Sequence, residues 1–153
     1  MKEAGKLIAQ NKKARHEYHV LDTLEAGIVL VGSEVKSCRR SSVAMRDSYA
    51  RIENGELFLV DVHIASYSPA SKFNHDPLRK RKLLFHRAEI KKLYGKLREK
   101  GLAFIPLRMY FNARGKVKVE MALAKGKKLY DKREAIKRKD RKRDAETQHK
   151  YKP

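Results

Sequence analysis

The stretch Ala26-Gly27-Ile28-Val29-Leu30-Val31-Gly32-Ser33-Glu34-Val35-Lys36-Ser37 contains the chain's first clear change of secondary structure. Its apolar, largely β-branched run is typical of a buried strand. Gly32 interrupts that run, and the Ser33 hydroxyl can accept a hydrogen bond from a free amide of a first helical turn. The stretch therefore predicts a strand followed by a short helix over residues 33–40. Gly-Ser corners are common, so this corner alone fits any α+β domain.

Further strands are predicted on both sides of the corner. Residues 18–31 first alternate apolar and polar side chains, and a one-residue slip before Leu24 predicts a bulge or bend in one long strand. Asn54-Gly55 divides the apolar residues of segment 49–62. This pair favours a type I′ turn, which needs positive φ at both positions, so a hairpin is predicted there.

A second hairpin is predicted near the end of the apolar part of the chain. Residues 102–111 form its first strand, residues 112–115 its turn, and residues 116–124 its return strand. The return strand alternates, with Lys116 and Lys118 on the face opposite the apolar residues. One face of this antiparallel sheet should therefore be exposed, and its lysines can follow a phosphate backbone.

A helix and a loop are predicted between the two hairpins. Apolar residues between Ala88 and Leu97 follow a helical stripe, and Gly101 is expected to end that helix. Residues 66–79 are rich in Ser, Asn and Pro and predict a loop. His75-Asp76 in this loop resembles a catalytic pair. No nucleophile elbow lies nearby, so the Asp before Pro is expected to set a turn instead.

Composition points to nucleic acid as the partner. The 153 residues suffice for one domain, and 38 Lys and Arg against 18 Asp and Glu give a formal charge of +20. Such an excess is most often neutralised by nucleic acid. An anionic membrane is disfavoured because no apolar run approaches the roughly 18 residues of a spanning helix. The first residues lead into no signal-peptide core, so we expect a cytoplasmic protein.

The same residues argue against several kinds of site. The single cysteine, Cys38, excludes an internal disulfide and any cysteine-based metal cluster, and is expected to be a small buried side chain. The six histidines show no metal-binding helix spacing, and the chain contains no Gly-rich phosphate loop. We therefore expect no enzymatic activity, no metal and no cofactor.

The two ends of the chain differ from its middle. Residues 1–10 are mixed in character and are expected to be flexible. Residues 131–153 hold ten Lys or Arg against five acids, with Ile136 and Tyr151 as their only large apolar residues. Such a segment cannot offset its own ordering entropy, so we expect a basic tail that is disordered when free and becomes helical on a polyanion.

Six short motifs stand in a fixed order: Glu25-Ala26-Gly27, Gly32-Ser33-Glu34-Val35-Lys36-Ser37, Asp47-Ser48-Tyr49-Ala50, Asn74-His75-Asp76-Pro77, Arg81-Lys82-Leu83-Leu84 and Ala124-Lys125-Gly126-Lys127-Lys128. In this order they closely resemble the SsrA-binding protein (SmpB) family, the bacterial partner of transfer-messenger RNA. The resemblance runs from about Asn11 to Arg133. Cys38 and Arg40 stand where Leu and Gly are expected, a departure that concerns packing more than function.

This resemblance implies a fold and a function. The fold is mainly β with flanking helices: a small antiparallel OB-like β-barrel over residues 11–130, followed by the tail. The barrel would bind the tRNA-like domain of transfer-messenger RNA. The tail would become helical on a stalled ribosome, in its vacant messenger channel and decoding centre, so that trans-translation can begin. We expect a monomer when free. Composition alone leaves open a generic ribosomal or structural RNA-binding protein.

The resemblance also implies site residues. Asn11, His16, Glu25, Leu84 and Lys116 match family positions tied to RNA binding, and Lys12, His86 and Lys118 are expected beside them. For Leu84 simple core packing is an open alternative, and for Glu25 we leave open pairing with a base amino group or orienting a lysine. Tyr130 matches a family position, commonly His, that stacks on a decoding-centre base, although packing against the barrel's end is its alternative. Ribosome contacts are expected from Lys125, Lys127, Lys128, Tyr130, Asp131, Lys132 and Arg133.

Overall fold

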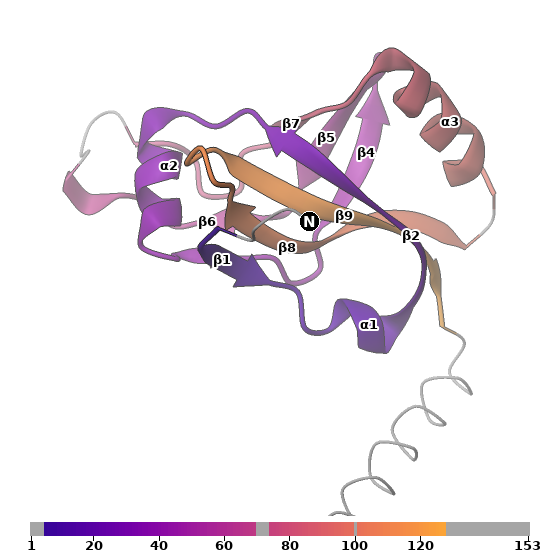
Figure 1. Ribbon diagram of the computed structural model, residues 1–153, viewed down its shortest axis with the longest axis horizontal. Helices are drawn as coiled ribbons and strands as arrows, with labels where there is room; N and C mark the ends of the chain where they lie inside the picture. Colours follow the sequence, from indigo (N-terminus) through magenta and orange to yellow (C-terminus); the bar gives the residue numbers. More distant parts are fainter. Residues whose placement is uncertain (1–4, 70–73, 100, 128–153) are drawn as a thin grey trace, which may run out of the picture.

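The computed structural model describes residues 5–69, 74–99 and 101–127, which form a curved antiparallel sheet with three helices (Figure 1). The elements in chain order are β1 (Leu7–Gln10), α1 (Ala14–Glu17), β2 (Tyr18–Ile28), α2 (Gly32–Arg39), β3 (Val43–Ala44), β4 (Tyr49–Glu53), β5 (Glu56–Val60), β6 (His63–Ile64), β7 (Arg81–Leu84), α3 (Arg87–Leu97), β8 (Leu102–Phe111) and β9 (Val117–Gly126).

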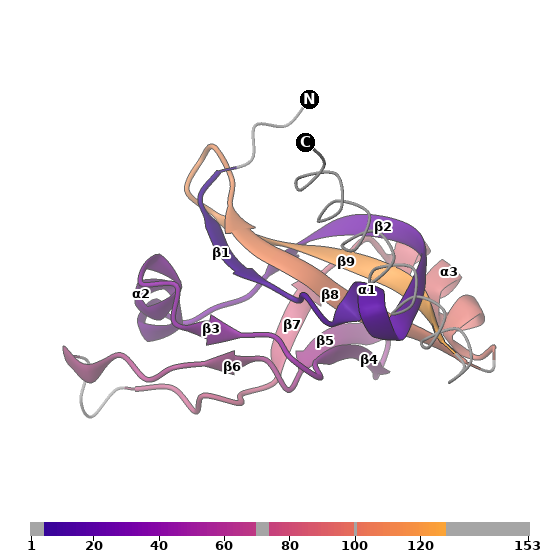
Figure 2. The same ribbon diagram turned by 90° about the horizontal axis from the view of Figure 1, so that it is seen from below.

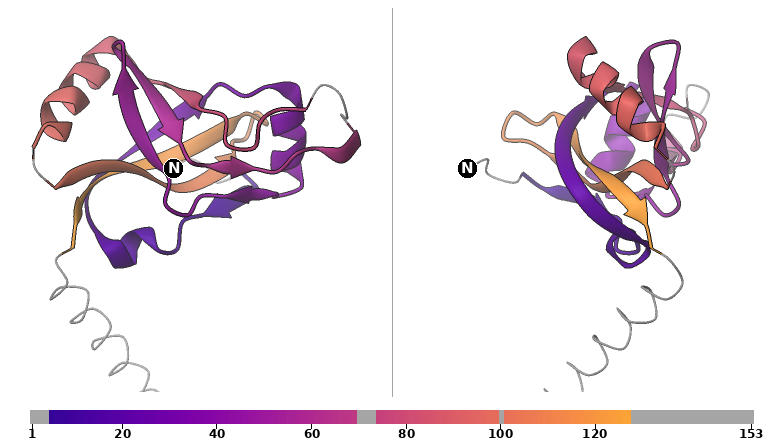
Figure 3. Two further views of the ribbon diagram at one scale, coloured as in Figure 1. Left: turned by 180° about the vertical axis from the view of Figure 1, so that it is seen from behind. Right: turned by 90° about the vertical axis from the view of Figure 1, so that its right-hand side faces the viewer.

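Seven strands form the main sheet in the order β1-β8-β9-β2-β7-β5-β4, and β3 pairs with β6 separately. The sheet curls strongly, as Figures 2 and 3 show from below, from behind and from the side. Its two edge strands, β1 and β4, form no ladder with each other among the described residues. The predicted fold class, an antiparallel OB-like sheet with flanking helices, is therefore confirmed, but the barrel is open along one seam, and α1 was not predicted.

The core lies inside this curl. Strand β9 turns Val119 and Met121 inward, where they meet Met109 of β8 and Leu57 of β5, all of them fully buried. On the outer face a smaller apolar cluster around Ile105 is covered by α1. One end of the outer face is therefore closed by packing, and the rest carries polar groups.

The first strand-to-helix corner is close to its prediction. Helix α2 spans Gly32–Arg39, one residue earlier than expected. Ser33 is not the N-cap: Val31 takes that position, and its backbone N–H donates to Glu34 Oε1 at 2.9 Å. Ser33 instead hydrogen-bonds His75 Nδ1 at 2.8 Å, and His75 Nε2 lies 2.8 Å from the Ile64 carbonyl oxygen. The Ser33–His75 pair thus ties the 74–79 loop to α2.

One predicted turn and one predicted bulge are present in the structure. Asn54 and Gly55 have φ values of 50° and 76°, so the β4–β5 hairpin has the predicted turn. The register of β2 against β9 shifts between Val20 and Asp22, which confirms the predicted bulge.

Two local predictions are wrong, one near the N-terminus and one at the end of α3. Residues 7–10 are not frayed, because β1 pairs with β8 in the antiparallel ladder. Gly101 does not end α3: the helix stops at Leu97 with Arg98 as its cap, and Gly101, at φ 84°, forms the turn into β8. Residues 1–4 and the predicted tail, 131–153, lie outside the described residues.

A buried ion cluster holds α2 against the sheet. Glu34 and Arg81 are both fully buried, and Arg81 donates through Nε to Glu34 and through Nη1 to the Val62 carbonyl oxygen at 2.7 Å. Arg79 Nη2 donates to Glu34 Oε1 at 2.6 Å. Burial alone raises the pKa of Glu34, but these hydrogen bonds outweigh it and hold the pKa below the ordinary 4.5.

Cys38 lies beside this cluster and is fully buried, as expected. Burial, and then the neighbouring Glu34 charge, raise the pKa of its thiol to about 11. The thiol therefore stays protonated at neutral pH and is a packing group.

Candidate nucleic-acid interface

The uncovered part of the outer sheet face carries the candidate site. Along β9, Lys118 stands opposite Tyr110 of β8 on one side and Gly27 of β2 on the other. Gly27 in turn stands opposite Leu84 of β7. These four residues form one row across four strands, because residues directly opposite in a ladder share a face. Residues far apart in sequence are thus brought together by strand register alone.

Gly27 has no side chain, so the backbone of β2 is uncovered in the middle of this row. A Cβ built on it would lie 3.1 Å from Leu84 Cδ1 and 3.6 Å from Lys118 Nζ. The leucine side chain and the lysine ammonium therefore meet over the glycine backbone. An apolar surface and a positive charge stand next to each other at this point, which suits a nucleotide with its base and phosphate.

A second row lies beside the first. Glu120 of β9 stands opposite both Arg108 and Glu25, and Arg108 Nε donates to Glu120 Oε2 at 2.6 Å. The Tyr110 hydroxyl donates to the Glu25 carboxylate, and the Arg108 guanidinium lies 5.0 Å from the Tyr110 ring centroid. Burial, and then the hydrogen bond to Glu25, raise the pKa of Tyr110 above its ordinary 10.

Tyr110 of the first row thus gives Glu25 of the second row a partner within the protein. A carboxylate on a basic face is held in place by a phenol that stays protonated, so its position is fixed before any RNA arrives. The two roles considered for Glu25 from the sequence, pairing with a base amino group and orienting a lysine, did not include this tyrosine.

A groove of about 1420 Å³ joins these rows to α3. Four of the eight predicted RNA-binding residues line it: Glu25, Leu84, His86 and Lys118. The groove also takes basic side chains from β7 and α3, namely Lys82, Arg87 and Lys91. Glu56 and Glu89 line it as well, and Lys82 Nζ donates to Glu56 Oε1 at 3.0 Å, so Arg87, Lys91 and Lys118 are the cations best placed to hold phosphates in this concave surface.

Leu84 is not a core residue. Its side chain is 52% exposed, whereas the neighbouring Leu83, pointing to the opposite face of β7, is 1% exposed. His86 is also exposed, at the N-cap of α3, where its backbone N–H donates to Glu89 Oε1 at 3.2 Å.

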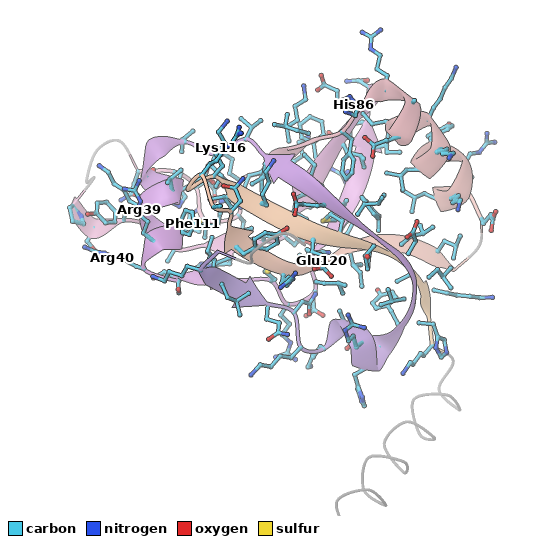
Figure 4. The ribbon with its side chains drawn as sticks, viewed as in Figure 1. Arg39, Arg40, His86, Phe111, Lys116 and Glu120 are labelled. Atoms are coloured by element: carbon cyan, nitrogen blue, oxygen red, sulfur yellow. The ribbon has the colours of Figure 1, made fainter. Side chains whose placement is uncertain are left out.

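Lys116 lies apart from the groove. It is exposed in the turn between β8 and β9, at the end of the sheet opposite His86 (Figure 4). Its backbone N–H donates to Asn112 Oδ1 at 2.9 Å, which fixes the turn and leaves its side chain to extend outward.

The three N-terminal candidates form a separate group. Asn11 donates through Nδ2 to the Pro106 carbonyl oxygen at 3.0 Å, so its amide anchors the chain to β8. Asn11 and Lys12 line a depression of about 450 Å³ together with Arg108 and Glu120. His16 is exposed on α1 and lines neither this depression nor the groove. The Arg108–Glu120 pair therefore lies between this group and the groove.

Two of the predicted ribosome-contacting residues can be placed. Lys125 is exposed near the end of β9, and the Lys127 backbone N–H donates to the Glu17 carbonyl oxygen at 2.9 Å. Both lie at the α1 end of the sheet. Lys128, Tyr130, Asp131, Lys132 and Arg133 lie outside the described residues.

Residues 5–69, 74–99 and 101–127 contain no group of three or more His, Cys, Asp or Glu side chains that could hold a metal ion. In the same ranges, no helix has the length and apolar character to cross a membrane.

Comparison with known proteins identifies the family. A family model described as "SmpB protein" matches residues 8–151. The chain belongs to the SmpB family. An SsrA-binding protein of Symbiobacterium thermophilum is 61% identical over 137 residues, 90% of this chain and 87% of the relative. One of Persephonella marina is 58% identical over 147 residues and covers 96% of each chain.

A solved SmpB-family structure supports the same assignment. It is described as "tmRNA-SmpB: a journey to the center of the bacterial ribosome" and is 50% identical to this chain, with a TM-score of 0.69. The match covers 84% of this chain and 93% of that one.

Several residues of this SmpB-family surface were missed from sequence. Tyr110 and Arg108 can be identified as partners of Glu25 and Glu120 only when the register of β8, β9 and β2 is known. Lys82, Arg87 and Lys91 could have been suspected from the basic flanks of β7 and α3, but nothing local places them in one groove.

Proposed function

We propose that this protein binds the tRNA-like domain of transfer-messenger RNA and delivers it to stalled ribosomes for trans-translation. Membership of the SmpB family is the observation that carries the proposal, and the similar solved structure is described as a tmRNA–SmpB complex in the ribosome. The groove adds a physical reason. It gathers four candidate RNA-binding residues and three further basic side chains on one face.

Binding would combine charge and surface contact. Lys118, Arg87 and Lys91 neutralise phosphates, and counterion release makes that binding sensitive to salt. Leu84 supplies an exposed apolar surface beside the bare backbone of Gly27, against which a base or ribose can pack. Glu25, held by Tyr110, presents an acceptor to base amino groups. His86 stands at the rim, where its ring can stack on a base.

The remaining candidates extend this surface. Asn11, Lys12 and His16 lie beyond the Arg108–Glu120 pair, and Lys116 lies at the end of the β8–β9 hairpin. We assign Lys12 and Lys116 to phosphates, because both side chains are exposed and charged. Asn11 acts by fixing the chain that carries Lys12.

The ribosome would be engaged by the end of the chain. Lys125 and Lys127 lead out of β9, and the residues that follow, Lys128, Tyr130, Asp131, Lys132 and Arg133, would contact the decoding centre and the messenger channel. The tail would act there by binding, with no enzymatic step and no cofactor, in the cytoplasm. A turnover assay on labelled RNA with Mg²⁺ tests the non-enzymatic part.

The test of the proposal is recovery of RNA from cells. The tagged protein is mixed with a bacterial lysate, and the bound RNA is sequenced. Transfer-messenger RNA should dominate, and Lys118→Glu should remove it, since that change reverses a charge in the groove. Lys96→Glu is the matched control, because Lys96 is exposed on α3 but does not line the groove. Recovery of bulk ribosomal RNA alone would favour a generic RNA-binding protein.

A further inference from the structure

A second cavity lies where the sheet fails to close. Strands β4 and β8 lie against each other, but they are not ladder partners in the sheet. A cleft of about 470 Å³ opens there, beside α1. We call it the seam cleft. Its larger apolar lining residues are Tyr18, Tyr49, Ile52, Leu97, Leu102, Phe104 and Ile105. Of these, Tyr49 is 38% exposed, so the cleft presents apolar surface to solvent.

The chain leaves the sheet at the edge of this cleft. Gly126 stands opposite Tyr18 in the ladder, and its N–H donates to the Gly101 carbonyl oxygen at 3.1 Å. The next residue, Lys127, donates its N–H to the Glu17 carbonyl oxygen at 2.9 Å. Glu17 and Tyr18 both line the cleft. Residues 128–153 therefore start within one residue of a backbone contact on the rim.

The first apolar residues after this exit are Leu129 and Tyr130. Extended chain advances about 3.3–3.6 Å per residue, so these side chains are within reach of a cleft that begins at Glu17. We propose that the seam cleft holds the Leu129-Tyr130 segment of the same chain when the protein is free.

Charge favours this occupant over RNA. The cleft is lined by two acids, Glu17 and Asp47, and two bases, Lys13 and Arg51, and Arg51 is paired with Glu53. The charges lining the cleft therefore cancel, whereas the groove, with four Lys and Arg against three Glu, keeps a small positive excess. Lys128 precedes the apolar pair, and Asp131 and Lys132 follow it, so this weakly basic segment meets no net repulsion in the cleft.

Docking would hold the start of the tail on the body until a ribosome takes it up. This consequence rests on the proposed function. The docking itself does not, and it is measured on the protein alone, without RNA. A failure of transfer-messenger RNA binding and a failure of docking are therefore separate results.

The chain contains no tryptophan, so one introduced tryptophan reports on its own surroundings. In the full-length protein, Tyr130→Trp should emit at shorter wavelength than Tyr151→Trp and be quenched severalfold less by acrylamide. Adding Tyr49→Glu to Tyr130→Trp should shift the emission to that of the Tyr151→Trp reference. Leu21→Glu is the matched control, because Leu21 is 57% exposed and does not line the cleft.

Tyr49→Ser serves as a second variant should the glutamate disturb folding, and thermal melting checks both. Equal emission and quenching for the tryptophans at 130 and 151 would overturn the proposal. Unchanged Trp emission with Tyr49→Ser in a folded protein would also overturn it. Loss of RNA affinity in Tyr49→Ser without a change in Trp emission would assign the cleft to RNA instead.

Discussion

Leu84→Ala separates RNA binding from folding more sharply than any other single change in the groove. Leu84 is 52% exposed, so its truncation should cost the free protein at most about 1 kcal/mol, half of what full burial of a leucine contributes. The exposed half of the side chain is what RNA would cover. Losing that contact should cost binding about 1 kcal/mol, or roughly fivefold in Kd.

The adjacent residue provides the control. Leu83 is 1% exposed on the opposite face of β7, so Leu83→Ala should cost about 2–5 kcal/mol of stability. Thermal melting by circular dichroism and fluorescence anisotropy with the tRNA-like domain measure both quantities for both variants. A Leu84→Ala protein that melts normally and binds with unchanged Kd would refute the assignment of Leu84 to the RNA face.

Four further predictions concern the buried ion cluster, the RNA face and the end of the chain. Glu34→Gln should destabilise the fold by about 3–5 kcal/mol, because it leaves the buried Arg81 guanidinium without its anion. The pKa of Glu34 is lowered in the folded protein, so the stability that its carboxylate contributes is present above pH 4.5 and is lost as pH falls through the lowered pKa. Urea unfolding at several pH values should therefore show that the stability of the variant depends less on acid than that of the unchanged protein. Tyr110→Phe should weaken RNA binding only while Glu25 is present, so a double-mutant cycle with Glu25→Gln should give a coupling energy, and additive losses would contradict the positioning role. Deleting residues 131–153 should leave the melting temperature and RNA affinity nearly unchanged but abolish tagging, whereas Tyr130→Ala should impair tagging and Tyr130→His retain it; a truncated protein that unfolds would contradict the division near residue 130.

Local signals in the sequence were sufficient for much of the fold. Asn54-Gly55 predicts its hairpin because the required positive φ is a property of those two residues. The slip before Leu24 marks a real bulge, since alternation along a strand is also local. Helix α2 lies one residue earlier than predicted, and at its start the Glu34 side chain rather than the Ser33 hydroxyl satisfies a free backbone amide.

Long-range partners could not be predicted from local pattern. Arg81 looks like a surface residue in a basic run, and it is buried because Glu34, 47 positions earlier, neutralises it. Tyr110 and Glu25 are 85 positions apart and meet only through strand register. The exposure of Leu84 depends on which face of β7 packs inward, and a four-residue strand of Arg, Lys and two Leu leaves that open.

Competition binding at several salt concentrations measures whether the protein prefers transfer-messenger RNA to other RNA. The labelled tRNA-like domain of transfer-messenger RNA is titrated with the full-length protein, and unlabelled ribosomal RNA competes. We expect a clear preference for the tRNA-like domain. We also expect log K to fall with log salt with a slope of roughly −4, as for about five neutralised phosphates. Equal affinity for both RNAs, or an affinity independent of salt, would contradict the proposed function.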